Sequence, residues 1–347
     1  MIRQSTTAAL PHLRRLLCPS GHIRPRMRSM KSPEDRRRRA HNYLVPRHGL
    51  TRREALEQLP ARDIRHALAN DSLISLGHGL LGPQTNNASP SALHTLQALT
   101  AIGGRTVGHE TAAALWGLIP VPLGPPYHLI HARGRARTRR SGLVVSHTAD
   151  VPERFCATYQ SIPLTDPAWT WTDLALKLPM LQALILADIA VRPGRTEFGE
   201  TTGSLTRVSD LRDAAKARGP ANGAKTVRTA SLLARPGADS PQETTLRYYM
   251  YEANLPEPQV NVWLLDEHGR RIVQPDLSVE KYRLAIQYEG QSVHSDPEQV
   301  LRDVRRQERT EALGWVEVRI TKEHMRHSGA GAVAKITRAL RKQGWRS

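Results

Sequence analysis

The chain has 347 residues, 39% of them hydrophobic, which suits about two or three domains with cores of their own. The net charge is +18 and the pI is near 10.7. This excess favours a polyanionic partner, because each Lys or Arg that neutralises a phosphate releases condensed counterions. No apolar run approaches the roughly 18 residues of a membrane span, so no membrane partner is expected. Only two cysteines, Cys18 and Cys156, are present and no disulfide framework is possible, which predicts a cytoplasmic protein.

Residues 1–48 are expected to form a basic, disordered tail. Residues 1–50 hold twelve basic residues against the acidic pair Glu34 and Asp35, which accounts for about +10 of the net charge. Such a tail is more often a solvated arm than a specific reader of nucleic acid. Met27 and Met30 are candidate start residues, so the sequence does not assign the tail to the mature protein.

Residues 49–84 have the outline of a winged helix. Two short helices are predicted over 52–59 and 61–69, followed by a tight hairpin over 73–81. Arg62 and Arg65 on the second helix are the candidate DNA-contacting residues. A small helical cap without DNA contact fits the same spacing equally well.

A mixed α/β region is predicted over residues 90–192, followed by a linker and helices over 193–237. The expected elements of the first part are helices over 91–102 and 109–118, strands over 127–131 and 143–147, and helices that end near Val191. The most apolar stretch, Leu178 to Val191, contains Gln182 and Asp188 and is too short for a membrane span, so it predicts a buried helix.

Five arginines lie between the two predicted strands of this region. On a hairpin tip they are suited to gripping a phosphate backbone, while a solvated loop is the simpler alternative. They are Arg133, Arg135, Arg137, Arg139 and Arg140.

Residues 238–326 predict a third unit with the element order αβββαβ, and residues 327–347 a C-terminal helix. Ser240 and Pro241 are typical of a helix N-cap and first turn. The expected elements are a helix over 240–254, strands over 259–265, 273–277 and 282–288, a basic helix over 296–312 and a strand over 315–321.

Several side chains of this unit have the chemistry of a metal-dependent nuclease, which needs hard oxygen ligands on a rigid surface to hold Mg²⁺ against a phosphate. Gln287 and Glu289 share one face of their strand, since residues i and i+2 point the same way. Asp276 lies on the neighbouring predicted strand, and Glu243 on the preceding helix can approach it. His294 follows a glycine turn and is a candidate general base.

The next helix carries arginines at helical spacing, suited to phosphate: Arg302, Arg305, Arg306 and Arg309. Each of these features has a simpler explanation alone. A Pro-Asp pair usually makes a turn, a lone histidine is usually structural, and an arginine stripe is usually a solvated face. The ordered set is the stronger signal.

That ordered set resembles the Vsr-like endonuclease family of the PD-(D/E)XK type. The matching features are Ser-Pro-x-Glu, Pro-Asp-Leu, Gln-Tyr-Glu-Gly, His294 and Arg-Asp-x-Arg-Arg, over about residues 238–326. The resemblance implies a restriction-endonuclease-like fold and makes Glu243, Asp276, Glu289 and His294 candidate active-site residues, with Mg²⁺ or Mn²⁺ as the cofactor. Relatives have Glu-x-Asp where this chain has Gln287-Tyr288-Glu289, which removes one negative charge from the metal site.

The first half of the chain resembles another family. The segments LTRREALEQLPARDIRHALANDSLISLGHGLLG, GHETAAALWGL and IPLTDPAWTWTDLA are similar to AbiEi-type antitoxins of type IV toxin–antitoxin systems. This resemblance implies an N-terminal winged helix and a cognate toxin protein as a partner.

The sequence therefore predicts an α+β multi-domain protein with a winged helix in front and a nuclease-like domain behind. The leading hypothesis is a DNA-binding protein with a Mg²⁺-dependent endonuclease domain. The alternative is a non-catalytic, antitoxin-like repressor, which Gln287 favours. RNA is a third and weaker candidate substrate, since no RNA-binding module is visible.

Overall fold

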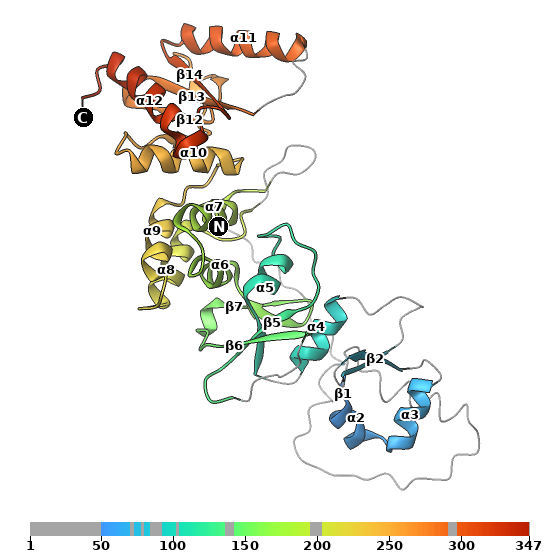
Figure 1. The fold of residues 1–347 in the computed structure, drawn as a ribbon. Coiled ribbons are helices and arrows are strands. Elements are labelled where there is room, and N and C mark those ends of the chain that lie inside the picture. The colour runs from blue at the N-terminus through green and yellow to red at the C-terminus, as the bar shows by residue number, and fades with distance from the viewer. Residues whose placement is uncertain are drawn as a thin grey trace, which may run out of the picture.

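The structure is a computed structural model, and it describes residues 50–69, 73–77, 80–83, 92–101, 104–135, 142–194, 203–290 and 297–346. The predicted tail over 1–48 lies outside these residues. The described chain is of mixed α/β composition and consistent with the α+β class, with sheets that contain parallel and antiparallel pairs. Three groups of elements follow one another from the N-terminal to the C-terminal end (Figure 1).

The first group contains the predicted helices and hairpin. Its elements are β1 (Leu50–Thr51), α2 (Arg52–Gln58), α3 (Ala61–Ala69), β2 (Leu73–Gly77) and β3 (Leu80–Pro83). β2 and β3 pair antiparallel, as the hairpin prediction requires, and β1 adds a third strand on the other side of β3. A small apolar core holds the helices to the strands, formed by Ala55, Ile64, Ala67, Leu73 and Leu81.

The second group begins with a five-stranded sheet in the order β6-β5-β4-β8-β7. The strands are β4 (Arg105–Val107), β5 (Tyr127–His131), β6 (Val144–Thr148), β7 (Cys156–Tyr159) and β8 (Ile162–Thr165), and the helices beside them are α4 (Ala92–Ala101) and α5 (His109–Leu115). Apolar side chains of α4 and α5 share a core with the central strands.

The prediction of an arginine-bearing hairpin tip between β5 and β6 is wrong. These two strands pair in parallel, with Tyr127 opposite Val144 and His131 opposite Thr148. Parallel neighbours require a crossover connection of about a dozen residues rather than a turn. Arg133 in this crossover pairs with Asp150 at 3.4 Å. Arg137, Arg139 and Arg140 lie outside the described residues.

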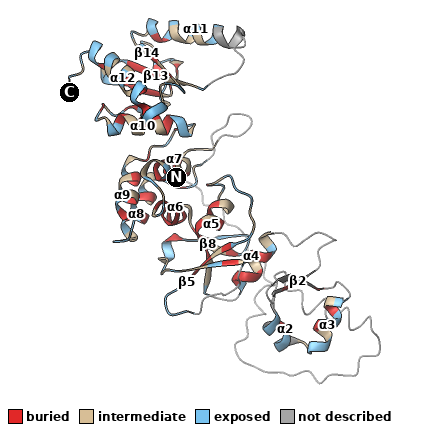
Figure 2. Ribbon diagram, viewed as in Figure 1, coloured by how far each residue is buried: buried red, intermediate tan, exposed pale blue. Residues whose placement is uncertain are grey.

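Four helices complete the second group and share one apolar core: α6 (Pro167–Ala175), α7 (Met180–Val191), α8 (Val208–Ala217) and α9 (Ala224–Leu233). Asp166 caps α6 by accepting a hydrogen bond from the Trp169 N–H at 2.8 Å. The predicted buried helix corresponds to α7, which buries Ala183, Leu184 and Ala187. This core contains residues from both sides of the boundary predicted between residues 192 and 193, so α8 and α9 pack with the middle region. Buried residues are dense in α6 and α7 (Figure 2).

The third group is built on a four-stranded sheet in the order β14-β13-β12-β9. The sheet consists of β9 (Gln259–Val260), β12 (Leu277–Val279), β13 (Leu284–Glu289) and β14 (Val316–Thr321), with a separate ribbon of β10 (Leu264–Leu265) and β11 (Arg271–Val273). Its helices are α10 (Pro241–Glu252), α11 (Pro297–Ala312) and α12 (Arg326–Lys342). Ordered along the chain, α10, the four strands of the main sheet and α11 reproduce the predicted αβββαβ series, with α12 added.

Two predicted strands of this group are shorter than expected. The stretch 259–265 splits into β9 and β10 because Asn261 has a positive φ of 50°, which ends the extended conformation. Asp276 was expected inside a strand over 273–277, but it lies just before β12. Its side chain accepts a hydrogen bond from the Tyr288 N–H, so it engages β13 before regular strand pairing begins.

The two faces of the main sheet differ in chemistry. Alternate residues such as Leu277, Ile286 and Val318 pack with α10 and α12 in one apolar core. The opposite face carries Gln287 and Arg319, which are paired in register, and α11 covers it. Figure 1 shows α11 on one side of the sheet and α10 on the other. The polar face therefore carries the candidate functional residues of this unit.

In the parts of the chain that the structure describes, no helix is both long enough and apolar enough to span a bilayer.

Candidate functional site

Asp276 and Gln287 meet on the polar face of the C-terminal sheet. Leu277 pairs with Ile286, so the preceding Asp276 comes opposite Gln287. The Gln287 side-chain amide donates to Asp276 Oδ1 at 2.8 Å, and the Tyr288 N–H donates to Asp276 Oδ2 at 2.6 Å. Both carboxylate oxygens are therefore held by neutral donors of the protein.

Glu243 lies close to this pair but is engaged in helix capping. Its carboxylate accepts from the Ser240 hydroxyl at 2.8 Å and from the Asp239 N–H at 2.9 Å, and the Ser240 hydroxyl accepts from the Glu243 N–H. Asn261 links the Glu243 side chain to the Asp276 backbone: its side-chain amide donates to Glu243 Oε2 at 2.8 Å, and its N–H donates to the Asp276 backbone carbonyl. The structure therefore brings Glu243 near Asp276 while using it to begin α10.

The pKa of the Asp276 carboxyl is raised to about 6. Burial is the largest cause and the charge of Glu243 acts in the same direction, while the hydrogen bonds from Tyr288 and Gln287 and the charge of Arg306 oppose the rise. A bound cation would stabilise the charged form of a carboxyl group that lies beside another negative charge. Perturbed pKa values of this kind cluster at functional sites.

Glu289 points to the same face as Gln287 but has a different partner. Arg319 lies 3.4 Å from Glu289 Oε1 and 2.8 Å from Glu317. The guanidinium group also donates to the Asp303 carbonyl of α11 at 3.1 Å. Among the described residues, no three His, Cys, Asp or Glu side chains form a ready metal site, and His294 lies outside them.

The predicted arginine stripe divides between two environments. Arg302, Arg305 and Arg309 are exposed on α11. Arg306 is not available to phosphate as predicted, because it faces the sheet and pairs with Asp303 at 3.1 Å and with Glu317 at 3.7 Å. In the first group, Arg62 and Arg65 are exposed on α3.

Sequence reasoning missed Glu317 and Arg319, which anchor α11 to the polar face. The signal was present, since alternation in the strand over 316–321 places these two on one face and Val318 and Ile320 on the other. That they lie beside Gln287 and Glu289 becomes visible only with the parallel pairing of β13 with β14.

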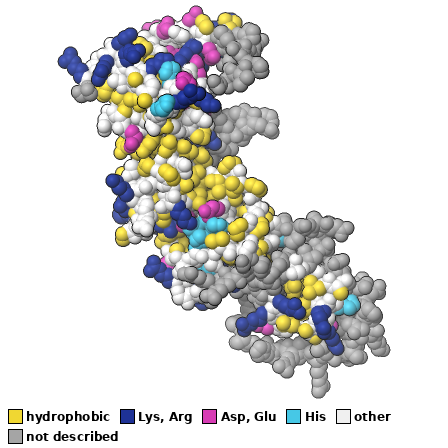
Figure 3. Space-filling model, viewed as in Figure 1, with side chains coloured by type: hydrophobic (Ala, Val, Ile, Leu, Met, Phe, Trp, Pro, Cys, Tyr) yellow, Lys and Arg dark blue, Asp and Glu magenta, His cyan; other side chains and the backbone are white. Residues whose placement is uncertain are grey.

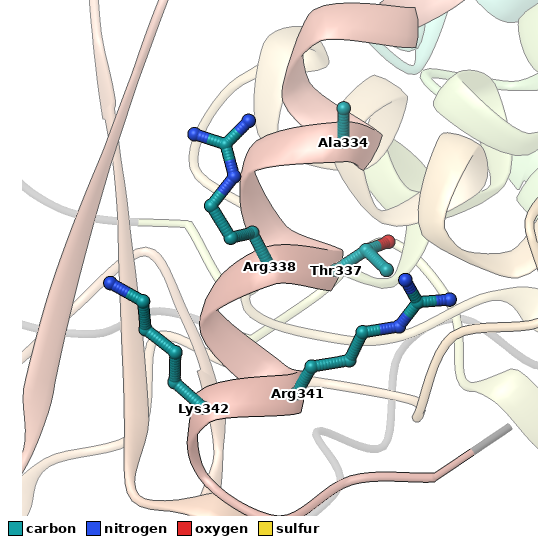
Figure 4. Close-up of a pocket in the computed structure, with 5 residues that line it drawn as sticks. All are labelled: Ala334, Thr337, Arg338, Arg341 and Lys342. Atoms are coloured by element: carbon teal, nitrogen blue, oxygen red, sulfur yellow. The ribbon is translucent and has the colours of Figure 1, made fainter.

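A second basic surface lies on α12, on the other side of the sheet from α11. Arg338, Arg341 and Lys342 are exposed there and line a shallow hollow with Ala334 and Thr337. Figure 4 shows Arg338 and Lys342 extending to one side of the helix and Arg341 to the other. The C-terminal unit therefore presents positive charge on both sides.

The comparisons with known proteins give relatives without a described activity. No protein-family model matches the sequence. Two uncharacterised proteins of Mycobacterium tuberculosis, from two strains, are each 29% identical over 276 residues, which covers 78% of this chain and 93% of the relative. The crystal structure of the RV2827C protein from the same species matches with a TM-score of 0.39 and 12% identity, over 67% of this chain and 89% of that one.

Proposed function

We propose that this protein binds DNA without cutting it, and that its C-terminal unit is a restriction-endonuclease-like domain of the Vsr type in which metal binding has been lost. The observation that carries the proposal is the contact between Gln287 and Asp276 at 2.8 Å. The amide occupies the position at which the resemblance implies a second acidic ligand. A neutral donor there satisfies Asp276 but adds no negative charge to hold Mg²⁺.

The charge distribution supports DNA as the partner. The net charge is +18, and Arg302, Arg305 and Arg309 lie on the exposed side of α11. Phosphate contacts from such a helix give affinity without sequence information. The arrangement of β1, α2, α3, β2 and β3 supports a winged helix, with Arg62 and Arg65 as further contacts. These features suit an AbiEi-like repressor with a cognate toxin as its partner.

Salt-dependent binding tests the role of α11. Fluorescence anisotropy with a labelled duplex is measured across a salt series for the wild type and for the triple variant R302S/R305S/R309S. The slope of log affinity against log salt should fall by about 2–3, because each lost phosphate contact contributes about 0.9. The matched control is R338S/R341S/K342S on α12, which makes the same charge change and should leave the slope near that of the wild type. A slope that falls only in the control would assign DNA to the other side of the domain.

Cleavage is tested with supercoiled plasmid in Mg²⁺ or Mn²⁺. The wild type should nick no more than Asp276→Ala, while Gln287→Glu restores the missing charge and is the variant most suited to recover metal-dependent nicking.

An active Mg²⁺-dependent endonuclease is the second candidate, favoured by the raised pKa of Asp276 beside Glu243. In that case Asp276, Glu289 and Glu243 would hold the ion. Nicking by the wild type that Asp276→Ala abolishes would establish this candidate and reject the non-catalytic one.

A further inference from the structure

The strand β14 lies at one edge of the C-terminal sheet, and the described chain supplies no strand on its outer side. The Val316 N–H donates to the Arg283 carbonyl at 2.9 Å, so the backbone groups of Val316 face β13. In a parallel pair, the backbone groups of alternate residues face the neighbouring strand and those between them face away. The N–H and C=O groups of Glu317, Arg319 and Thr321 therefore point outward from the sheet.

Two side chains cover one end of this edge and agree with that assignment. The Lys335 ammonium group of α12 donates to the Arg319 carbonyl at 2.7 Å, and the Thr321 N–H donates to Nδ1 of His324 at 3.1 Å. Within the described chain, the Glu317 N–H, the Glu317 carbonyl and the Arg319 N–H have no hydrogen-bond partner. Such a row of backbone donors and acceptors is a template for a further strand.

The charges along the edge match those of a second copy of β14. Two antiparallel strands related by a two-fold axis place their outward-facing residues opposite one another as hydrogen-bonded pairs. A register that sets Glu317 opposite Glu317, or Arg319 opposite Arg319, is destabilised by like charges. With Val318 on the axis, Glu317 of each copy instead lies opposite Arg319 of the other. The same register sets Val316 opposite Ile320, so apolar residues also meet.

The side chains beside the edge suit this register. Glu317 and Arg319 of one chain already contact each other at 2.8 Å on the polar face. In the paired strands each gains an opposite charge from the second copy, so the four charges alternate in sign. Val316 is 39% exposed and would be covered by the added strand. Figure 3 shows acidic and basic side chains together on the visible face of the C-terminal unit.

We propose that two copies of this chain associate through β14 and join their main sheets into one. Glu317 of one copy and Arg319 of the other exchange two backbone hydrogen bonds, and the two-fold axis repeats them. Lys335 opposes this pairing, because its ammonium group occupies the position of the incoming Glu317 N–H. An interface built on one short strand falls below about 1,200 Å², the size of weak and reversible complexes. This inference does not depend on the proposed DNA binding.

Sedimentation velocity of the full chain tests the association directly. The concentration is varied about 100-fold, up to about 200 μM, which covers the range of a weak dimer. A species of twice 38.7 kDa should grow with concentration. A wild type that remains monomeric at the highest concentration would overturn the proposal, whatever else binds at this edge.

Charge reversal then tests the register. Glu317→Arg and Arg319→Glu each set like charges across the axis and should weaken the dimer by more than about 10-fold. A mixture of the two variants should associate as well as the wild type, because every arginine then faces a glutamate. The matched control reverses the exposed Glu323–Arg326 pair, which lies beyond the strand, in the same way. Dimerisation that both single variants retain would assign the interface to another surface and overturn the proposal.

Lys335→Met supplies a test with the opposite sign, and it holds even where a charge reversal prevents folding, which circular dichroism would show. The variant keeps the apolar stem of the side chain and frees the Arg319 carbonyl in both copies. The dimer should therefore tighten by about 10-fold. Lys225→Met, at an exposed lysine of α9, removes the same charge and should change nothing. A dimer that Lys335→Met leaves unchanged or weakens would contradict pairing through β14.

Discussion

Asp188 in α7 and Asp276 beside β12 are both carboxylates withdrawn from bulk water, but their partners differ. Asp188 pairs with the buried guanidinium of Arg247 at 2.6 Å and accepts from the Thr244 hydroxyl at 2.8 Å and from the Arg235 N–H at 2.9 Å. Asp276 has only neutral donors at hydrogen-bond distance, from Gln287 and Tyr288. The comparison teaches that a buried carboxylate with its own cation ties helices together, whereas one held only by neutral donors has a raised pKa and no fixed counter-charge.

The position of Asp188 agrees with a structural role. Arg247 and Thr244 belong to α10, and Arg247 also donates to the Leu233 carbonyl at the end of α9 at 2.6 Å. The network therefore fastens the helices of the second group to the first helix of the C-terminal group. A polar network satisfied on every side fixes the geometry between such elements.

The largest effect is expected from Asp188→Ala. The substitution leaves Arg247, which is 4% exposed, without its counter-charge. Breaking a buried pair on one side destabilises by about 3–5 kcal/mol, which urea unfolding measures. The control is Glu57→Ala at the exposed Arg53–Glu57 pair, which should change stability by less than about 1 kcal/mol. A loss at Asp188 as small as that of the control would remove the distinction between the two carboxylates.

A smaller effect is expected from Gly108→Ala beside the other buried pair, Asp173 with Arg218. The new methyl group would lie 2.3 Å from Ile130 Cδ1 and 3.4 Å from Asp173 Oδ2. Overpacking of this kind destabilises by about 1–3 kcal/mol. Gly124→Ala is the matched control, because nothing lies within 4 Å of a Cβ there. Equal melting temperatures for the two variants would show that the Ile130 side chain moves aside without loss of stability.

Local patterns in the sequence predicted most of the elements. The strand over 127–131 and the helices that became α7 and α10 follow from periodicity and capping signals close in the chain. The pairing of strands did not follow, because β5 and β6 could be joined by a hairpin or by a crossover of the same length. Both strands share an apolar core with α4 and α5, and such contacts between separate elements are not visible in a local pattern.

The same limit explains what was predicted of the sites. Asp276 and Gln287 were expected to meet because neighbouring antiparallel strands leave little choice of register. The contacts of His128 with Glu110 and with His147 were not predicted. His128 and His147 meet only through the parallel register of β5 with β6, and Glu110 reaches His128 from α5. Glu243 was interpreted as a ligand, although the Ser-Pro-x-Glu pattern that carries it is also a capping box. The structure assigns it the capping contacts.

The last prediction concerns Asp276 and the pH dependence of stability. Its pKa rises from 3.8 to about 6 on folding, so folding favours the protonated acid. This contribution to stability is present below about pH 4 and is lost as the pH rises through about 6. The side chain in Asp276→Asn is neutral at both pH values, and its amide oxygen can still accept a hydrogen bond from the Tyr288 N–H. The quantity compared is the free energy of unfolding of the variant minus that of the wild type. It should be larger at pH 7.5 than at pH 4 by up to about 2 kcal/mol, allowing for partial exposure.

Urea unfolding of both proteins at the two pH values measures this difference, and Asp266→Asn supplies a control of opposite sign. Burial acts to raise the pKa of Asp266, but hydrogen bonds from Arg270 and His268 outweigh it and lower the pKa. That carboxylate therefore stabilises the fold above its unfolded pKa, and Asp266→Asn should lose stability at pH 7.5 relative to acid. Profiles of the same sign in both variants would mean that folding stabilises Asp276 as an anion, and the pH dependence expected for Asp276 would fail.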